Sequence, residues 1–428
     1  MGIRAAARSS VLTACLCGPT LVPAQPLPVA EPTAHGFSAE GIARIDDFWA
    51  REVAAGRIPG AVVAIARDGR LVHYKAYGYL DREAGTPMPL DAIFQLASMT
   101  KVMAGVGALT LTEQGRLPLR SRLDAYFPQF ANPKVGVVLP NGDLAIEPAR
   151  QPITIHDLLR HTSGMTYGAR GSTAVHKLWP GSSAGAALQY GGEEFIAKVA
   201  ALPLLHAPGT AWEYGLSTDV LGLVVEKVSG QRLGAFLKDA VWDRVKMPDT
   251  SFEVPPDKQS RIARPLAKDP LTGRAQALAL LGRTPRFDCA GGCAWSTVGD
   301  YLRFAQMLLD GGALDGQRVL SPTMVTFMTS DHLGTQIRNQ VAGVEGHRDG
   351  YGFGLTVAVR LVDGVAAVPG SPGDYTWNGA NGTLFWNDPA ERLSVVAGTA
   401  GPGEIRKLYR EQMAALVYGA MTESRRRR

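Results

Sequence analysis

Hydrophobic residues recur at helical spacing near both ends of the 428-residue chain. Over about residues 38–55 they form one face of an amphipathic helix, with Ser38 placed to cap its start and Gly56 to end it. The apolar positions of this face are Ile42, Ile45, Phe48, Trp49 and Val53. Residues 405–418 have the same spacing and predict a second amphipathic helix that closes the chain.

Strand-like segments lie next to these two helices in the sequence. Residues 61–66 and 71–79 flank Asp68-Gly69, a pair typical of a tight turn, and so predict a hairpin. Far downstream, three more segments are strand-like: 352–359, 383–386 and 393–398. The region between is mostly loop and helical pattern, with helices expected over 102–113, 155–159, 220–228, 233–241 and 298–309.

Strands at both ends of the chain around a helical middle predict an α/β fold with one antiparallel sheet. Segments of about 38–95 and 310–420 build this sheet, helices flank it, and the mostly helical region 96–309 is inserted between them. We expect residues 25–37 to be a linker and 421–428 a basic tail. Two loops rich in glycine and proline are expected to be site walls or flexible connections, 164–192 and 255–286.

The composition indicates a large buried core, because 46% of the positions are hydrophobic and 19% are charged. The formal net charge of +5 reflects six arginines near the termini, Arg4, Arg8 and Arg425 to Arg428, and the rest of the chain is close to neutral. A nucleic-acid-binding surface is therefore not expected, since it needs basic residues gathered on a folded face.

The first 24 residues have the pattern of a signal peptide, in which two arginines precede an apolar stretch over 11–22 and a cleavage site ends at Ala24. A lipoprotein box that ends at Cys15 is a second interpretation, which would give a lipid anchor; we favour it less because few residues precede it. A disordered cytoplasmic N-terminus is a third. No later apolar run is long enough to span a membrane, so we expect an exported protein, periplasmic or secreted.

Two cysteines lie beyond this segment, Cys289 and Cys293, with Gly291 and Gly292 between them. The spacing permits a short disulfide loop in an oxidising compartment, and two reduced thiols in a glycine-rich turn are an equal alternative. Two thiols cannot close a zinc site, and no histidine stands near them at a ligand spacing, so no metal site is expected.

A single Ser-x-x-Lys motif, Ser98 to Lys101, stands where an apolar helix begins. Residues three apart share a helix face, so the hydroxyl and the amine can approach each other. A lysine whose pKa is lowered by burial can take the proton of such a serine, and a helix N-terminus stabilises negative charge on the oxygen. The motif indicates a serine nucleophile, and taken alone it also fits an ordinary first helical turn.

Three further motifs accompany this one in a fixed order. Residues 94–101 (FQLASMTK), 155–164 (IHDLLRHTSG), 212–215 (WEYG) and 247–252 (MPDTSF) together resemble the serine β-lactamase-like superfamily. This superfamily contains class C β-lactamases, D,D-peptidases and family VIII carboxylesterases, and the resemblance is closest to the last. It covers about residues 38–420 and implies the fold of β-lactamases and penicillin-binding proteins.

Position by position, the resemblance implies that Ser98 is the acylated nucleophile, Lys101 its proton partner and Tyr214 the second base or acid. A tyrosine needs neighbouring positive charge, such as that of Lys101, to act as a base. The family often has an asparagine two residues after this tyrosine. Here that residue is Leu216, which removes an amide that would hold a polar substrate group.

The family's Lys-Thr-Gly triplet aligns with Trp377, Asn378 and Gly379, followed by Ala380. The lysine that helps to hold a substrate carboxylate is thus replaced by a tryptophan, which offers a flat apolar wall. Family VIII esterases commonly have such a substitution. The resemblance also implies an oxyanion hole made by the backbone N–H groups of Ser98 and Ala380.

A rival nucleophile is Ser183, which lies in a Gly-x-Ser-x-Gly sequence over 181–185. That motif needs a strand before it, whereas the preceding segment is short and ends in a proline. His156 and His161 are candidate bases for a triad, but the resemblance gives their segment a structural role.

The sequence therefore predicts a serine carboxylesterase that hydrolyses small, neutral, short-chain esters through an acyl-enzyme on Ser98, without a cofactor. The alternatives are a β-lactamase or D,D-peptidase-type amide hydrolase, an acyltransferase, and a non-catalytic penicillin-binding-like module that binds cell-wall peptides or a partner protein. The expected partner is a small ester molecule.

Overall fold

The structure is a computed structural model that describes residue 2 and residues 26–426 of the chain. The expected signal peptide, with Cys15, lies outside the described residues apart from Gly2. Within the described part, no helix combines the length and the apolar character that a membrane crossing requires.

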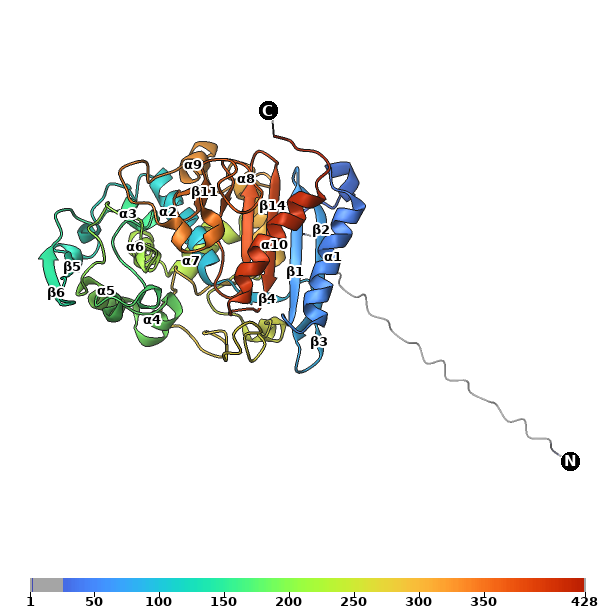
Figure 1. The fold of residues 1–428 in the computed structure, drawn as a ribbon, viewed down its shortest axis with the longest axis horizontal. Helices are drawn as coiled ribbons and strands as arrows, with labels where there is room; N and C mark the ends of the chain where they lie inside the picture. Colours follow the sequence, from blue (N-terminus) through green and yellow to red (C-terminus); the bar gives the residue numbers. More distant parts are fainter. Residues whose placement is uncertain (1, 3–25, 427–428) are drawn as a thin grey trace.

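An eight-stranded antiparallel sheet joins the two ends of the chain (Figure 1). Its strands are β1 (Gly60–Arg67), β2 (Arg70–Asp81), β3 (Thr86–Pro87), β10 (Tyr351–Phe353), β11 (Ala358–Arg360), β12 (Tyr375–Thr376), β13 (Leu384–Asp388) and β14 (Leu393–Thr399). Their order across the sheet is β10-β11-β12-β13-β14-β1-β2-β3. Because β1 pairs with β14, with Val63 opposite Ala397, the prediction of one sheet completed by distant segments is confirmed.

One expected strand is wrong in its extent. Residues 352–359 form not one strand but the two short strands β10 and β11, which pair with each other. The chain reverses between them, where Thr356 takes a positive φ of 67° that no extended strand contains.

The two terminal helices cover one face of this sheet. They are α1 (Ala39–Ala54) and α10 (Ile405–Ala420), which pack against each other, and in Figure 1 they lie side by side in front of the strands. Ser38 caps α1 as predicted, since its Oγ accepts a hydrogen bond from Gly41 N at 2.9 Å. Alternate residues of β1 face this layer, and the residues between them face the main core, so that both faces of the strand are buried.

The remaining helices lie on the other side of the sheet or in the inserted region. They are α2 (Thr100–Glu113), α3 (Ile155–Leu159), α4 (Ser183–Gln189), α5 (Gly192–Ala200), α6 (Ser217–Ser229), α7 (Leu233–Leu237), α8 (Val298–Leu309) and α9 (Pro322–Met328). The helices expected over 155–159 and 298–309 are confirmed at the same bounds, as α3 and α8. Helix α8 packs against β14, β1 and β13, and so forms the second layer on the sheet.

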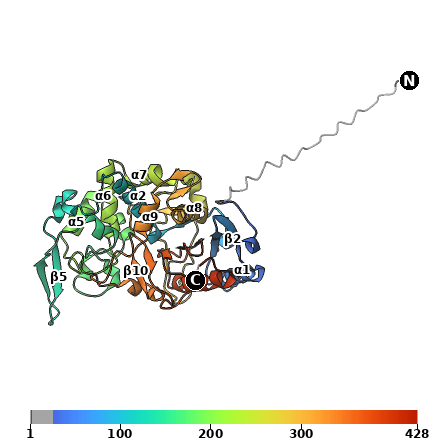
Figure 2. The same cartoon turned by 90° about the horizontal axis from the view of Figure 1, so that it is seen from above.

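Short strand pairs that the sequence did not predict complete the fold. They are β4 (Ile93–Gln95) with β7 (Trp295–Thr297), β5 (Lys134–Val138) with β6 (Leu144–Pro148), and β8 (Ala313–Leu314) with β9 (Gln317–Arg318). Figure 2 places β5 at the end of the molecule farthest from α1. The pair β4–β7 matters for the site, because it ends just before Ser98.

Both expected peripheral segments contact the folded body. In the segment 26–37, Leu27 and Phe37 are buried, and Leu71 N donates a hydrogen bond to Pro28 O at 2.8 Å. In the basic tail, Arg425 forms ion pairs with Asp68 and Glu423, and Arg426 pairs with Asp363.

Candidate active site

Ser98 lies in a tight turn between a strand and a helix. It belongs to the short 3-10 helix Ala97–Met99, which runs directly into α2, and it is half-buried. Ala97 has a φ of 48°, a left-handed conformation that costs energy in a residue with a side chain. Two hydrogen bonds hold this turn, from Leu96 N to Ala294 O at 2.9 Å and from Thr100 Oγ1 to Ala97 O at 2.7 Å.

Lys101 follows one helical turn later and is only 1% exposed. Its Nζ donates to Ser98 Oγ at 3.4 Å, to Tyr167 Oη at 3.1 Å and to Gly291 O at 2.5 Å, which uses all three ammonium donors. Burial alone lowers the pKa of Lys101, but the negative charges that Tyr167, Tyr214 and Asp219 can carry outweigh it and raise that pKa. This direction is opposite to the lowered pKa expected from burial alone, and the three hydrogen bonds from Nζ fit the ammonium form of Lys101.

Tyr214 makes the shorter of the two side-chain hydrogen bonds to the nucleophile oxygen. Its Oη donates a hydrogen bond to Ser98 Oγ at 2.6 Å, and Trp377 Nε1 donates to Tyr214 Oη at 3.1 Å. Lys101 Nζ lies 4.8 Å from the centroid of the Tyr214 ring. Ser98, Lys101 and Tyr214, which the sequence proposed together, thus meet around one oxygen atom.

Neither candidate histidine forms a hydrogen bond to Ser98 among the described residues. His161 is fully buried and its ring packs against Tyr214 with centroids 5.1 Å apart. Burial keeps its pKa well below the ordinary range, so the ring is neutral. The Nε2 atom of His156 instead lies 2.9 Å from His332 Nδ1.

The triplet Trp377, Asn378 and Gly379 lies beside the cleft, and Trp377 and Asn378 line it. Trp377 is 1% exposed, and the Arg348 guanidinium lies 4.3 Å from its ring centroid. Asn378 Nδ2 donates to Glu345 Oε2 at 3.0 Å, and Gly379 lies so close to Leu96 O that a Cβ would be 2.1 Å from it. The expected wall is thus tied to the nucleophile turn through backbone contact.

The two expected oxyanion donors lie on one cleft. Ala380 is exposed, and its backbone N–H makes no hydrogen bond within the described part of the chain. Ser98 and Ala380 both line a cleft of about 550 Å³. Leu216 does not: it is fully buried at the start of α6, within the main core, so its expected substrate contact has no support in the geometry.

Cationic side chains line this cleft, and most have partners within the protein. Arg170 pairs with Glu213, Lys407 with Glu404, and both Arg348 and Arg410 with Glu345. Arg406 donates to Pro402 O at 3.1 Å. Arg348 has no well-directed hydrogen bond among the described residues, and burial lowers its pKa to about 10.

The rival nucleophile Ser183 lacks the preceding strand that its Gly-x-Ser-x-Gly motif requires. It is the first residue of α4, Ser182 caps that helix, and the described segment 165–182 contains no strand. Ser183 Oγ donates to Asp219 Oδ2 at 2.7 Å and lies 2.7 Å from Tyr167 Oη. Ser183 therefore does not stand on a nucleophile elbow.

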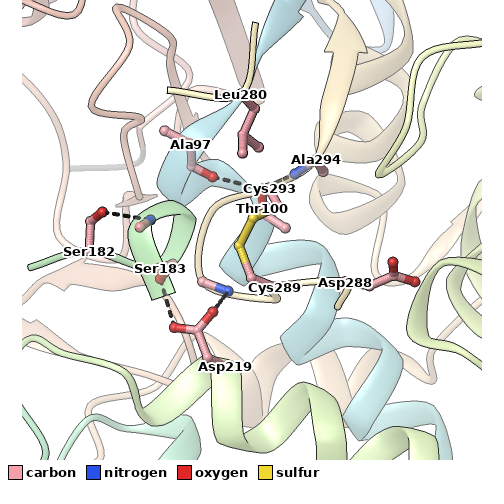
Figure 3. The surroundings of a disulfide bond; sticks show 12 residues. Ala97, Thr100, Ser182, Ser183, Asp219, Leu280, Asp288, Cys289, Cys293 and Ala294 are labelled. Carbon is pink, nitrogen blue, oxygen red and sulfur yellow. Dashed lines mark hydrogen bonds between the residues drawn. A yellow bond between two sulfur atoms is a disulfide. The ribbon is translucent and has the colours of Figure 1, made fainter. Parts of the chain in front are cut away.

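Cys289 and Cys293 form a disulfide with Cα atoms 5.2 Å apart (Figure 3). Of the two alternatives that the sequence allowed, a disulfide loop and two reduced thiols, the structure contains the disulfide loop. Both are fully buried. Within residues 2 and 26–426, no group of three or more potential metal-ligating side chains is present.

Three residues at the site were missed by sequence reasoning: Tyr167, Asp219 and Gly291. Tyr167 stands three positions after the second motif, and Asp219 five positions after Tyr214, in the first turn of α6. Tyr167 and Asp219 could have been proposed as site residues from the sequence, because each lies close to a recognised motif. Gly291 had no such signal, because only the folded loop brings its carbonyl to Lys101.

Comparisons with known proteins show the family of this chain. The family model described as Beta-lactamase matches residues 44–418. Protein Rv1367c of Mycobacterium tuberculosis is 36% identical over 356 residues, covering 80% of this chain and 86% of that protein. Esterase EstB of Burkholderia gladioli is 30% identical over 385 residues, covering 86% and 92% of the two chains.

A solved structure, of EstCE1, is described as that of a hydrolase with promiscuous acyltransferase activity. It is 26% identical, covers 89% of this chain and 99% of its own, and superimposes with a TM-score of 0.70. The match of the family model over most of the chain, with the shared fold, shows that this protein belongs to the Beta-lactamase family.

Proposed function

We propose that the protein is a serine carboxylesterase that hydrolyses small, neutral, short-chain esters through an acyl-enzyme on Ser98. The observation that carries this proposal is the pair of contacts at Ser98 Oγ, to Tyr214 Oη at 2.6 Å and to Lys101 Nζ at 3.4 Å. A hydroxyl held between a phenol and an ammonium, at the wall of an open cleft, is arranged for nucleophilic catalysis.

Acylation starts once Tyr214, a phenol that donates to Ser98 in the resting site, has released its proton to solvent as the phenolate. Ser98 Oγ then attacks the ester carbonyl, and the Ser98 proton passes to Tyr214 Oη. Lys101 stabilises that phenolate, because its positive charge lies 4.8 Å from the ring centroid. Tyr214 then gives the proton to the departing alkoxide, which leaves as the alcohol. The Ser98 and Ala380 backbone N–H groups stabilise the negative charge on the carbonyl oxygen.

In the second step, water takes the place of the alcohol. Tyr214 removes its proton, the hydroxide adds to the acyl carbon, and the carboxylic acid leaves as Ser98 regains its proton. The same groups act in both steps, so no cofactor is needed in this scheme.

The choice of neutral esters rests on the charges of the cleft. Arg170, Lys407 and Arg410 are each paired with a carboxylate of the protein, and Trp377 stands where related enzymes have a lysine. A substrate carboxylate would therefore have to compete with these protein carboxylates or bind the buried Arg348, which shares Glu345 with Arg410 and makes no well-directed hydrogen bond among the described residues. This favours the closest resemblance, to family VIII carboxylesterases, over a β-lactamase.

Acyl transfer is a second candidate function. EstCE1, whose description includes promiscuous acyltransferase activity, is similar over 89% of this chain. In chemical terms, an acyl-enzyme can pass its acyl group to an alcohol in place of water whenever the cleft admits both.

A fluorophosphonate probe tests the proposal, because it labels an activated serine covalently. We expect labelling of the peptide that contains Ser98, and Ser98→Ala should lose both the label and at least about a thousandfold in turnover of p-nitrophenyl butyrate. Ser183→Ala tests the rival nucleophile and should keep the label, at a lower rate because Ser183 Oγ bonds to Tyr167 and Asp219 beside Lys101. A chain that neither reacts with the probe nor turns over esters would instead be a non-catalytic binding module, and label on Ser183 would overturn the assignment of the nucleophile.

We also propose that the protein is exported, from the signal-peptide pattern of residues 1–24. N-terminal sequencing of the mature protein tests this and should begin at Gln25. A chain that begins at a modified Cys15 would support the lipoprotein alternative, and an intact N-terminus would contradict export.

A further inference from the structure

A closed ring of hydrogen bonds connects the Lys101 ammonium with the Asp219 carboxylate. One arm runs from Lys101 Nζ to Tyr167 Oη at 3.1 Å, from Tyr167 Oη to Ser183 Oγ at 2.7 Å, and from Ser183 Oγ to Asp219 Oδ2 at 2.7 Å. The other arm passes through Gly291, which accepts from Lys101 Nζ at 2.5 Å and donates to Asp219 Oδ1 at 2.8 Å. Because the single Ser183 hydroxyl proton goes to Asp219, Tyr167 Oη is the donor to Ser183 Oγ, and every donor then points from the cation towards the anion.

The loop between the two disulfide cysteines supplies the second arm. Gly291 is the middle residue of the loop 289–293, and both its C=O and its N–H take part in the ring. In Figure 3, Asp219 extends from its helix between Ser183 and the backbone of this loop. The disulfide thus closes the short segment that contacts the Lys101 ammonium.

The same loop is attached to the nucleophile turn at its other end. Ala294 N donates to Thr100 Oγ1 at 3.1 Å, and Ala294 O accepts from Leu96 N at 2.9 Å. The segment that follows Cys293 therefore holds both sides of the turn that contains Ser98. One short loop positions the serine and the lysine together.

The ring is buried and tightly packed, and its members Tyr167, Ser183 and Gly291 lie along the wall of the cleft. Lys101 is 1% exposed and Asp219 is 0% exposed. A Cβ built on Gly291 would lie 2.1 Å from Ser183 Oγ and 2.4 Å from Asp219 Oδ2, so only glycine fits between them. In such surroundings a hydrogen bond between charged groups is stronger than in water, and losing one partner is costly.

The charges of the two end members support each other. Burial raises the pKa of Asp219, and the Lys101 charge opposes that rise. Both carboxylate oxygens accept hydrogen bonds, as an ionised carboxylate does. Asp219 therefore compensates the buried ammonium without contacting it.

We propose that Asp219 and the disulfide-closed loop 289–293 are positioning elements that hold the Lys101 ammonium against Ser98. The inference rests on the proposed function, in which Lys101 must be charged and must lie close to Ser98 and Tyr214. Neither element touches the reacting atoms, so both act through Lys101.

The first test is Asp219→Asn, with Asp300→Asn as the matched control. Both aspartates are buried, but Asp300 lies in the first turn of α8, where its Oδ2 accepts a hydrogen bond from Asp249 N in a separate network. An amide accepts through one oxygen only, so its NH₂ group meets a second donor and one arm of the ring opens. We expect kcat for p-nitrophenyl butyrate, per site titrated with the phosphonate probe, to fall on the order of tenfold to a hundredfold, with KM little changed.

A pH profile separates this effect from a loss of folding. Without the Asp219 charge the pKa of Lys101 falls, so the alkaline limb of kcat/KM should move to lower pH in Asp219→Asn and stay in place in Asp300→Asn. A variant that is only less stable would show fewer titrated sites with an unchanged kcat and an unchanged limb. That result would overturn the proposal.

The second test removes the disulfide in the double variant Cys289→Ala/Cys293→Ala. We expect a fall in kcat on the order of tenfold per titrated site, because a misplaced group costs rate more than binding. Unchanged kcat in this variant would show that the loop does not need its disulfide to hold Lys101. A wild-type protein that the probe does not label at all would instead contradict the proposed function.

Discussion

The indole of Trp377 donates a hydrogen bond from Nε1 to Tyr214 Oη at 3.1 Å, and the same Oη donates to Ser98 Oγ at 2.6 Å. A residue that the sequence suggested as an apolar wall is therefore also a polar partner of the proposed base. The Arg348 guanidinium, 4.3 Å from the Trp377 ring centroid, adds a positive charge behind that donor. Together they favour negative charge on Tyr214 Oη during proton transfer.

This relationship predicts that Trp377→Phe lowers kcat by about tenfold to a hundredfold, because a hydrogen bond to a charged group contributes about 1.5–3 kcal/mol. Trp212→Phe is the control, since Trp212 is also buried beside Tyr214 but its Nε1 has no partner among the described residues. Steady-state kinetics with p-nitrophenyl butyrate compare the two. Equal losses would mean that packing, not the N–H group, is what Trp377 contributes.

Lys101 and Tyr214 should behave as one unit. We expect Lys101→Ala and Tyr214→Phe each to lower kcat by about a thousandfold or more, and the double variant to be little worse than either, because both serve one proton transfer. A double-mutant cycle on folded protein, checked by circular dichroism, measures this coupling. Multiplied losses would assign Tyr214 to substrate binding alone.

Substrate preference follows from the paired cations of the cleft. The kcat/KM for p-nitrophenyl butyrate should exceed that for a chromogenic cephalosporin by at least about a hundredfold, or 2.7 kcal/mol in transition-state binding. Both are measured at one pH. A cephalosporin turned over as well as the ester would favour the β-lactamase alternative and would implicate Arg348, which lines the cleft, in binding its carboxylate.

Stability should depend on the protonation of Asp300, whose pKa burial raises to about 7. Between about pH 4 and 7 the folded protein keeps a proton that the unfolded chain has released, so this group lowers the free energy of unfolding as pH rises. The slope is at most about 1.4 kcal/mol per pH unit.

Asp300→Asn removes this dependence, so the variant should gain stability relative to the wild type as pH rises through that window. Urea unfolding of both proteins at about pH 5 and pH 8 measures the difference. A difference that is the same at both values would mean that Asp300 is already ionised in the folded protein across this range.

Local patterns predicted the elements that build the frame of the site. The periodicity over 298–309 and the hairpin at Asp68-Gly69 were recognisable because a buried face or a tight turn restricts residue type within a short window. The Ser98 to Lys101 spacing is also local, since three residues on a helix fix how two side chains approach.

The division of 352–359 into the strands β10 and β11, and the short pair β4–β7, were not recognisable in this way. Each of these strands has only three residues, too few for a period to be detected, and β4–β7 joins segments about two hundred residues apart. Their existence depends on long-range pairing.

The sequence by itself therefore determined the antiparallel sheet from the two chain ends, the nucleophile motif and the order of the motifs. The tertiary structure alone decided that the neighbours of Lys101 raise its pKa, that Trp377 bonds to Tyr214, and that Leu216 lies in the core rather than at the cleft. It also brought Asp219 and the loop 289–293 to Lys101. The physical reason is that the charge of a buried group depends on neighbours that only folding brings close, whereas a helix or a hairpin depends on residues adjacent in the chain.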